Sequence, residues 1–160
     1  NQTLKYLIEF AKKNPDVNII LKGKTGVHKK YDIKLKKLPN NCTFIYGGSG
    51  EKLLKDATVV IAFNSTIVFE TIASNRNLII PNFNNENVAK KNILHKIENK
   101  IYFANSKKQF EKKINFYLNT KYKKRKLSNN NIKTLKYYVG NTNGSSGIKI
   151  QKFLNNILRK

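Results

Sequence analysis

Short runs of aliphatic and β-branched residues recur along the chain, and each is followed by a segment with helical spacing. The runs cover residues 17–21, 42–46, 58–62 and 78–80, with a shorter one within 100–104. Strands that are apolar throughout and alternate with helices are typical of a parallel sheet covered on both faces. The sequence therefore predicts an α/β fold, a Rossmann-like parallel sheet flanked by helices.

The segments between these runs carry the start and stop signals of helices. Apolar spacing predicts helices over about 3–13, 51–56, 66–74, 86–97, 106–118, 128–138 and 150–158. Ser106 and Gln109 form a capping-box pattern, and Ser128 is a suitable cap for the helix after it. The last helix has one apolar face, formed by Ile150, Phe153, Leu154, Ile157 and Leu158. A chain of 160 residues is long enough for one such domain with its own core.

The chain is strongly basic, with 32 Lys and Arg against 9 Asp and Glu and a net charge of +23. This balance indicates a phosphate-rich partner: a nucleotide, an anionic membrane surface or nucleic acid. Only Arg76, Arg125 and Arg159 are arginines, although Arg makes the bidentate contacts typical of nucleic-acid readers. Nucleic acid is therefore the least favoured of the three. Compositional drift with a solvated basic surface remains the simplest alternative.

The composition excludes several other classes of site. Cys42 is the only cysteine and lies in a strand-like run, so we expect a buried thiol and a reducing, cytoplasmic compartment. His28 and His95 stand apart from clustered carboxylates, which predicts no metal site. No apolar run approaches the roughly 20 residues that a bilayer crossing needs, and no signal peptide is visible. Peripheral attachment at the inner face of a membrane stays open.

The best site candidate is the segment after residues 58–62, where Asn64, Ser65 and Thr66 open a helix. The free amides and positive dipole end of a helix N-terminus favour an anion, and these side chains add donors there. Glu70 lies four residues after Thr66, so both belong to one helix face, where a carboxylate suits a ribose diol. In the alternative interpretation, Asn64 or Ser65 only caps the helix and Glu70 is solvated.

The order of several segments resembles the C-terminal half of GT-B glycosyltransferases. The segments are 47–50 (GGSG), 53–61 (LLKDATVVI), 64–66 (NST), Glu70, 78–81 (LIIP) and, more loosely, the tail 140–146 (GNTNGSS). The chain is most similar to bacterial capsule and surface-polysaccharide biosynthesis proteins and to CDP-glycerol glycerophosphotransferase-like enzymes. It departs from them at residues 75–77, where Asn75 must supply the left-handed turn that Gly usually makes.

The resemblance implies a nucleotide-binding domain whose substrate is a nucleotide-linked sugar or polyol, with no metal or cofactor. The implied contacts are Ser65 and Thr66, beside Asn64, on the diphosphate; Glu70 on the ribose; Gly48 and Ser49 near the base; and Lys22 or Lys24 against phosphate charge. The acceptor would be a glycan or a lipid-linked glycan. In such enzymes the N-terminal half supplies the acceptor site and often the catalytic base, so no catalytic residue is assigned here.

These observations lead to one expectation and two alternatives. Residues 1–160 are expected to form a single domain cut from a longer transferase, with 121–160 as a C-terminal helical extension, able to bind a donor but inactive alone. A sugar-nucleotide epimerase of the same architecture is the first alternative. The second is a non-enzymatic basic module for nucleic acid or an anionic membrane, to which the basic run at 121–126 would contribute.

Overall fold

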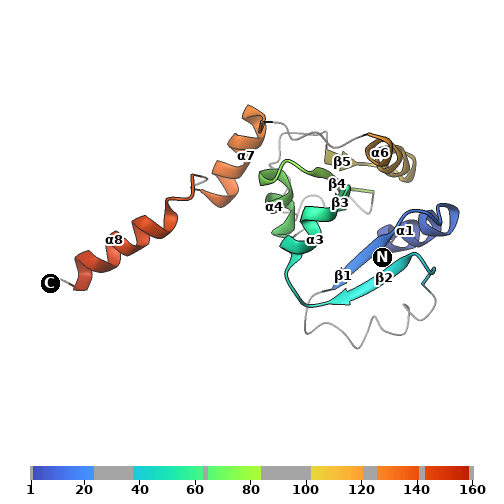
Figure 1. Ribbon diagram of the computed structural model, residues 1–160. Helices are drawn as coiled ribbons and strands as arrows, with labels where there is room; N and C mark the ends of the chain where they lie inside the picture. The colour runs from blue at the N-terminus through green and yellow to red at the C-terminus, as the bar shows by residue number, and fades with distance from the viewer. Residues whose placement is uncertain are drawn as a thin grey trace.

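Strands and helices alternate along the chain, in agreement with the sequence (Figure 1). The computed structural model describes residues 2–23, 38–62, 65–83, 102–120, 126–140 and 143–158. The strands are β1 (Ile19–Gly23), β2 (Cys42–Tyr46), β3 (Val59–Ile61), β4 (Asn77–Pro81) and β5 (Phe103–Ala104). The helices are α1 (Gln2–Lys13), α3 (Gly50–Asp56), α4 (Ile67–Ala73), α6 (Lys107–Asn119), α7 (Asn129–Val139) and α8 (Ser146–Leu158). The helix expected over 86–97 lies outside the described residues.

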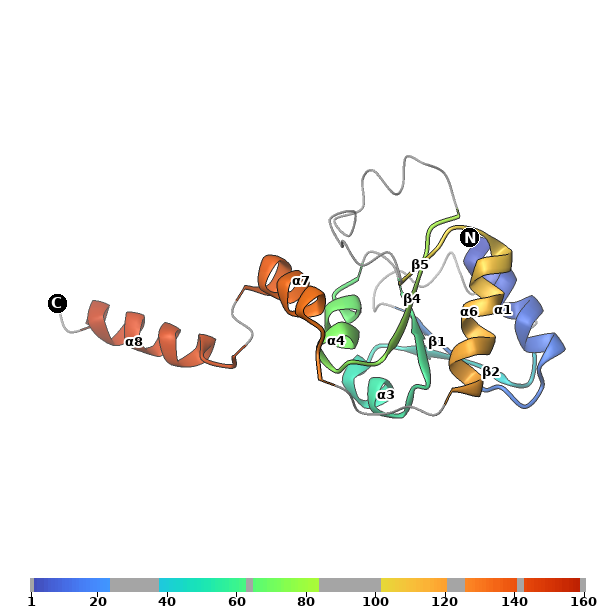
Figure 2. The same cartoon turned by 90° about the horizontal axis from the view of Figure 1, so that it is seen from above.

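All strand pairs of the described chain are parallel, which confirms the α/β fold class. The hydrogen bonds divide the strands into two small sheets, one of β1 and β2 and one with the order β3-β4-β5. In the first sheet, Ile19 pairs with Cys42 and Gly23 with Tyr46, so the two strands begin and end together. Helices flank both sheets, as the view from above shows (Figure 2). Parallel strands bring the loops that follow them to one edge of a sheet.

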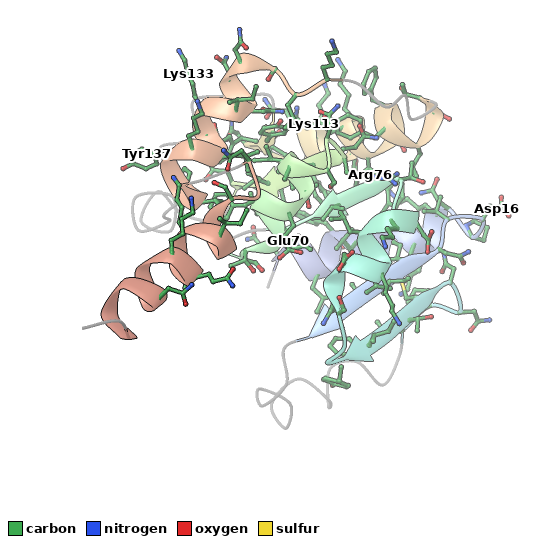
Figure 3. All side chains as sticks on the ribbon, turned by 60° about the vertical axis from the view of Figure 1, so that its left-hand side comes forward. Asp16, Glu70, Arg76, Lys113, Lys133 and Tyr137 are labelled. Carbon is green, nitrogen blue, oxygen red and sulfur yellow. The ribbon has the colours of Figure 1, made fainter. Side chains whose placement is uncertain are left out.

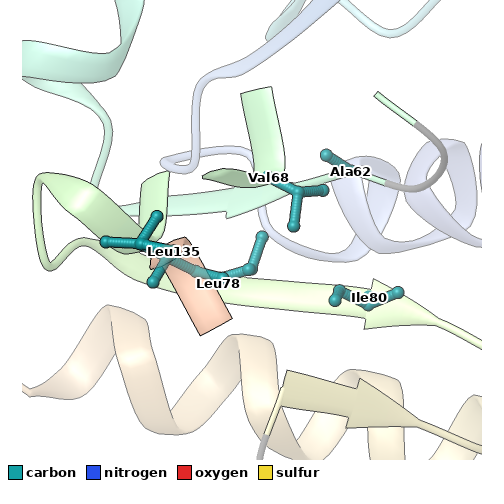
Figure 4. Packing of buried hydrophobic residues seen from close by; sticks show 6 residues of the cluster. Ala62, Val68, Leu78, Ile80 and Leu135 are labelled. Carbon is teal, nitrogen blue, oxygen red and sulfur yellow. The ribbon is translucent and has the colours of Figure 1, made fainter. Parts of the chain in front are cut away.

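The centre of the core is β4, which is buried on both of its faces. Leu78 and Ile80 point to the face covered by α4 and α7, where they join the first core cluster (Figure 4). Ile79, between them, points to the opposite face and joins a second cluster with Phe10 of α1 and Phe110 of α6. Successive strand residues face opposite sides, so a fully apolar strand is stable only when both sides are covered. This is the physical reason for the unbroken apolar run at 78–80.

Local signals in the sequence set most of the helix starts. The Ser106 hydroxyl accepts a 3.2 Å hydrogen bond from the Gln109 amide, and Gln109 Oε1 accepts one of 2.8 Å from the Asn105 amide. The Ser128 hydroxyl caps α7 in the same way, at 3.2 Å from the amide of Asn131. After α4, Asn75 has a φ of 53°, which confirms that it takes the left-handed conformation expected at this turn.

The two C-terminal helices differ in how they meet the rest of the molecule. α7 packs against α4, where Leu135 enters the first core cluster and the rings of Phe69 and Tyr138 lie 4.9 Å apart. α8 instead leads away from the sheets (Figures 1 and 2), and its described side chains are exposed. None of the described helices combines the length and apolarity needed to cross a membrane.

Candidate functional site

The ends of β1 and β2 are joined by a lysine side chain. Lys22 lies one residue before the end of β1, and its Nζ donates a 2.7 Å hydrogen bond to the carbonyl oxygen of Gly47, directly after β2. The Lys22 side chain thus reaches over the carboxyl edge of this sheet and holds its positive charge beside the glycine loop. Ligands of open α/β sheets bind at this edge, beyond the carboxyl ends of the strands.

The same loop also meets the segment that follows β3. A Cβ added to Gly50 would lie 3.3 Å from Cδ1 of Ile67 and 4.0 Å from Cε of Lys22. Ile67 is the first residue of α4, so the end of β1, the loop after β2 and the start of α4 come together at one place. The first two segments belong to the sheet of β1 and β2, and α4 follows β3 of the other sheet. Tertiary packing therefore brings together three described positions close to candidate residues: Lys22 itself, Gly50 after Ser49, and Ile67 after Thr66.

The loop of residues 47–49 is shaped by glycine and capped by serine. Gly47 and Gly48 have φ values of 66° and 70°, the left-handed conformation that glycine adopts without strain. Gly48 is exposed, and no atom of the described residues lies within 4 Å of where a Cβ would stand, so this part of the loop leaves room for a ligand. Ser49 Oγ accepts a 3.2 Å hydrogen bond from the Glu51 amide and so caps α3. The Ser49 hydroxyl only accepts in this bond, so it can still donate its own hydrogen to a ligand.

The start of α4 differs from the expectation in one respect. The helix begins at Ile67 with Thr66 as its N-cap residue, within one residue of the expected start, but the amides of its first turn are not free. The amides of Val68 and Phe69 donate to the carbonyl oxygens of Ser65 and Thr66, at 3.1 and 2.9 Å. Such bonds to the third preceding residue tighten a first turn and use amides that an ideal terminus leaves free. The expectation of free helix amides here is therefore too simple, and the side-chain hydroxyls become the main donors.

Those hydroxyls are well placed to act on a ligand. Thr66 is exposed, and its side chain makes no capping bond to the helix. Within the described chain, the Ser65 hydroxyl has no hydrogen-bond partner either. Ser65 therefore does not cap the helix in the described chain. Asn64, the other cap of that alternative, lies outside the described residues, and the exposed Glu70 agrees with the alternative's solvated carboxylate. An unsatisfied hydroxyl offers one donor and two acceptor directions.

Glu70 lies one turn further along α4, directly above Thr66. Its amide donates a 3.2 Å hydrogen bond to the Thr66 carbonyl oxygen, so the two residues share one helix face as expected. The carboxylate is exposed and pairs with no cation of the described chain. Arg76 stands well apart from Glu70 (Figure 3) and donates to the Lys55 carbonyl oxygen instead, at 2.7 Å. Glu70 is therefore available to a hydroxyl-bearing ligand.

Other predicted positions give no further site. Asn64, Lys24, His28 and His95 lie outside the described residues. Cys42 is buried and free, and its burial raises the pKa of the thiol, as expected of a core cysteine. The described residues hold no group of three or more His, Cys, Asp and Glu side chains that could bind a metal.

A cavity of about 470 Å³ lies at the opposite end of β1 and β2. Its lining includes Asn18 and Asn41, which directly precede the two strands. Asn41 Nδ2 donates to the carbonyl oxygens of Ala11, Asn14 and Val17 at 2.9–3.1 Å, which fastens the end of α1 to the sheet. Because this cavity borders the amino ends of the strands, we assign it no part in the site. The local sequence gives no signal for this clamp or for the contact between Lys22 and Gly47.

Comparison with protein-family models, with curated proteins and with solved structures returns no match for this chain. The fold class therefore rests on the strand pairing and the core, and the site on its own geometry.

Proposed function

We propose that this chain is the donor-binding domain of a GT-B-type transferase that builds a bacterial surface glycan or polyol-phosphate polymer. The observation that carries the proposal is the proximity of Lys22, Gly50 and Ile67, which brings the end of β1, the start of α3 and the start of α4 together at one edge. Nucleotide donors bind at this edge in open α/β folds. The proposal also draws on the resemblance in the order of the sequence segments.

Each part of the site has a chemical counterpart in a nucleotide-linked donor. The hydroxyls of Ser65 and Thr66 would donate to the diphosphate, and Lys22 would exchange its bond to Gly47 for one to a phosphate oxygen. Charge-assisted hydrogen bonds of this kind are the stronger ones, and they stabilise the diphosphate as it becomes the leaving group. Glu70 would accept from the ribose hydroxyls, and the exposed Gly48 would border the base.

A binding titration with matched variants tests this proposal. UDP-, CMP- and CDP-linked donors are titrated against the protein by calorimetry, and amide shifts are followed by NMR. Thr66→Val removes the hydroxyl after β3, while Thr58→Val makes the same change before β3, at the far end of the strand. We expect Thr66→Val to weaken binding by about tenfold, the effect of one hydrogen bond to a charged group, and Thr58→Val to leave it unchanged.

A second pair of variants tests the carboxylate. Glu70→Gln should weaken the binding of a ribose-containing donor by on the order of tenfold and leave the binding of inorganic pyrophosphate unchanged. Glu111→Gln, on α6, is the control. If no donor shifts the amides of residues 65–70, or if the control variants weaken binding equally, the proposal is wrong. A binding constant that collapses with added salt would indicate unspecific polyanion binding instead.

A further inference from the structure

The C-terminal part of the chain is basic without interruption. Glu111 is the last acidic residue, and residues 112–160 contain 13 Lys and Arg and no Asp or Glu. All 9 acidic residues of the protein precede this segment. A drift of the whole composition toward lysine would not by itself remove acidic residues from one end, so the asymmetry calls for a physical explanation.

Exposed apolar side chains concentrate in the same segment. Among the described residues, seven large apolar side chains are exposed, and five of them lie after Glu111, each more than half exposed. The five are Phe116, Tyr137, Val139, Ile148 and Ile150. Exposing such side chains in water is unfavourable, and four of the five lie on the last two helices, α7 and α8.

The geometry of α7 and α8 presents both kinds of side chain outward. α7 is fastened to the core by Leu135, and its outer side carries Lys133 and Tyr137, which project away from the molecule (Figure 3). α8 then leads away from the sheets beyond a connection in which Gly140 and Gly144 have φ values of 79° and 75°. Its described side chains include two isoleucines and two lysines, Ile148, Ile150, Lys149 and Lys152, all of them exposed.

We infer that α7 and α8 dock on an anionic lipid bilayer and lie in its interface. Isoleucine and valine side chains would enter the boundary between headgroups and acyl chains, and tyrosine would lie at headgroup level. Lysines reach lipid phosphates from an apolar helix because their methylene stems extend along it. Each contributes attraction to an anionic leaflet, and no carboxylate of this segment opposes it. Nucleic acid would match the charge but would leave the exposed isoleucines in water.

Vesicle sedimentation with a pair of apolar variants tests the insertion. The whole chain is mixed with vesicles of phosphatidylcholine, with or without one-third phosphatidylglycerol. Ile148→Gln with Ile150→Gln should lower partition onto the anionic vesicles by about tenfold. Ile20→Gln is the matched control, since Ile20 is 51% exposed but lies in β1, and it should change partition less than about twofold.

A pair of charge variants tests the electrostatic attraction between the lysines of α8 and anionic lipid. Lys149→Gln with Lys152→Gln should lower partition onto the anionic vesicles by on the order of tenfold, while Lys12→Gln with Lys13→Gln, at the end of α1, should not. Circular dichroism verifies that each variant keeps its helix content. The inference is overturned if neutral vesicles bind equally well, if the isoleucine pair binds like the parent, or if a single-stranded oligonucleotide binds and vesicles do not.

Discussion

Lys22 Nζ lies 2.7 Å from the carbonyl oxygen of Gly47, although 25 residues separate them. This bond joins β1 to the loop after β2 and keeps a positive charge at the carboxyl edge of the sheet. Because Lys22 is exposed, the bond costs little to break, and a phosphate oxygen is a stronger partner than a neutral carbonyl. The same lysine can therefore hold the loop in the free protein and bind the donor in the complex.

The first prediction concerns the exchange of the Lys22 hydrogen bond from the Gly47 carbonyl oxygen to a phosphate oxygen of the donor. Lys22→Met keeps the aliphatic stem beside Gly50 and removes the charge. We expect the variant to bind a nucleotide donor about tenfold more weakly, with a free energy of unfolding within about 0.5 kcal/mol of the parent. Calorimetric titration and urea unfolding measure the two quantities. Lys52→Met, on the exposed side of α3, is the control, and an equal loss of binding there would point to net charge alone.

The second prediction concerns the glycine loop. Gly48 has a φ of 70° and open space around it, so an added methyl group meets no neighbour but strains the backbone. Gly48→Ala should lower the free energy of unfolding by about 1 kcal/mol, and Gly48→Asn by less, because Asn tolerates the left-handed region. Gly147→Ala, in α8, should be neutral or stabilising. Thermal unfolding of the three variants provides the comparison, and equal behaviour of Ala and Asn at position 48 would contradict it.

The third prediction compares two phenylalanines of α6. Phe110 is fully buried between β4, β5 and α1, whereas Phe116 is 62% exposed. Phe110→Ala should cost about 3–5 kcal/mol of unfolding free energy, because it removes apolar contacts and leaves a cavity. Phe116→Ala should cost less than about 0.5 kcal/mol. Should Phe110→Ala fail to fold, Phe110→Leu provides a milder measurement, and a cost no larger than that of Phe116→Leu would contradict the packing.

The fourth prediction concerns a polar pair between Tyr102, directly before β5, and Asn131 of α7. The hydroxyl of Tyr102 donates a 2.8 Å hydrogen bond to Oδ1 of Asn131, which is buried. Tyr102→Phe leaves this oxygen without its partner and should cost about 1–2 kcal/mol at neutral pH, measured by urea unfolding. Tyr6→Phe, which removes a hydroxyl with no hydrogen-bond partner in the described chain, is the control and should cost less than about 0.5 kcal/mol.

The pH dependence of that pair provides an independent check. Burial raises the pKa of Tyr102 above its ordinary value of 10.0. The folded state therefore holds the phenol proton more tightly than the unfolded chain does, and the stability from this group is lost as the pH rises above about 10. The difference in stability between the parent and Tyr102→Phe should accordingly shrink between pH 9 and pH 11. A constant difference would show that Tyr102 titrates equally in both states.

Local signals allowed much of the fold to be predicted. The apolar run at 42–46 predicted both ends of β2 correctly. The serine caps of α6 and α7 were predicted from side chains within three positions of each helix start. The left-handed conformation of Asn75 was expected for the same reason, because one residue's backbone preference decides it. Such features depend on neighbours in the chain, so the sequence alone carries them.

Contacts between distant segments decided two features. They divided the strands into two sheets, and they brought the residues of the candidate site together. The alternating burial of Leu78, Ile79 and Ile80 required helices from opposite ends of the chain to cover both faces of β4. The start of α4 at Ile67 followed from a tightened first turn that no residue preference specified. The sequence determined which elements form, because each is set by short-range spacing. Only tertiary packing decided that Lys22, Gly50 and Ile67 meet, because their proximity depends on how the two sheets lie against each other.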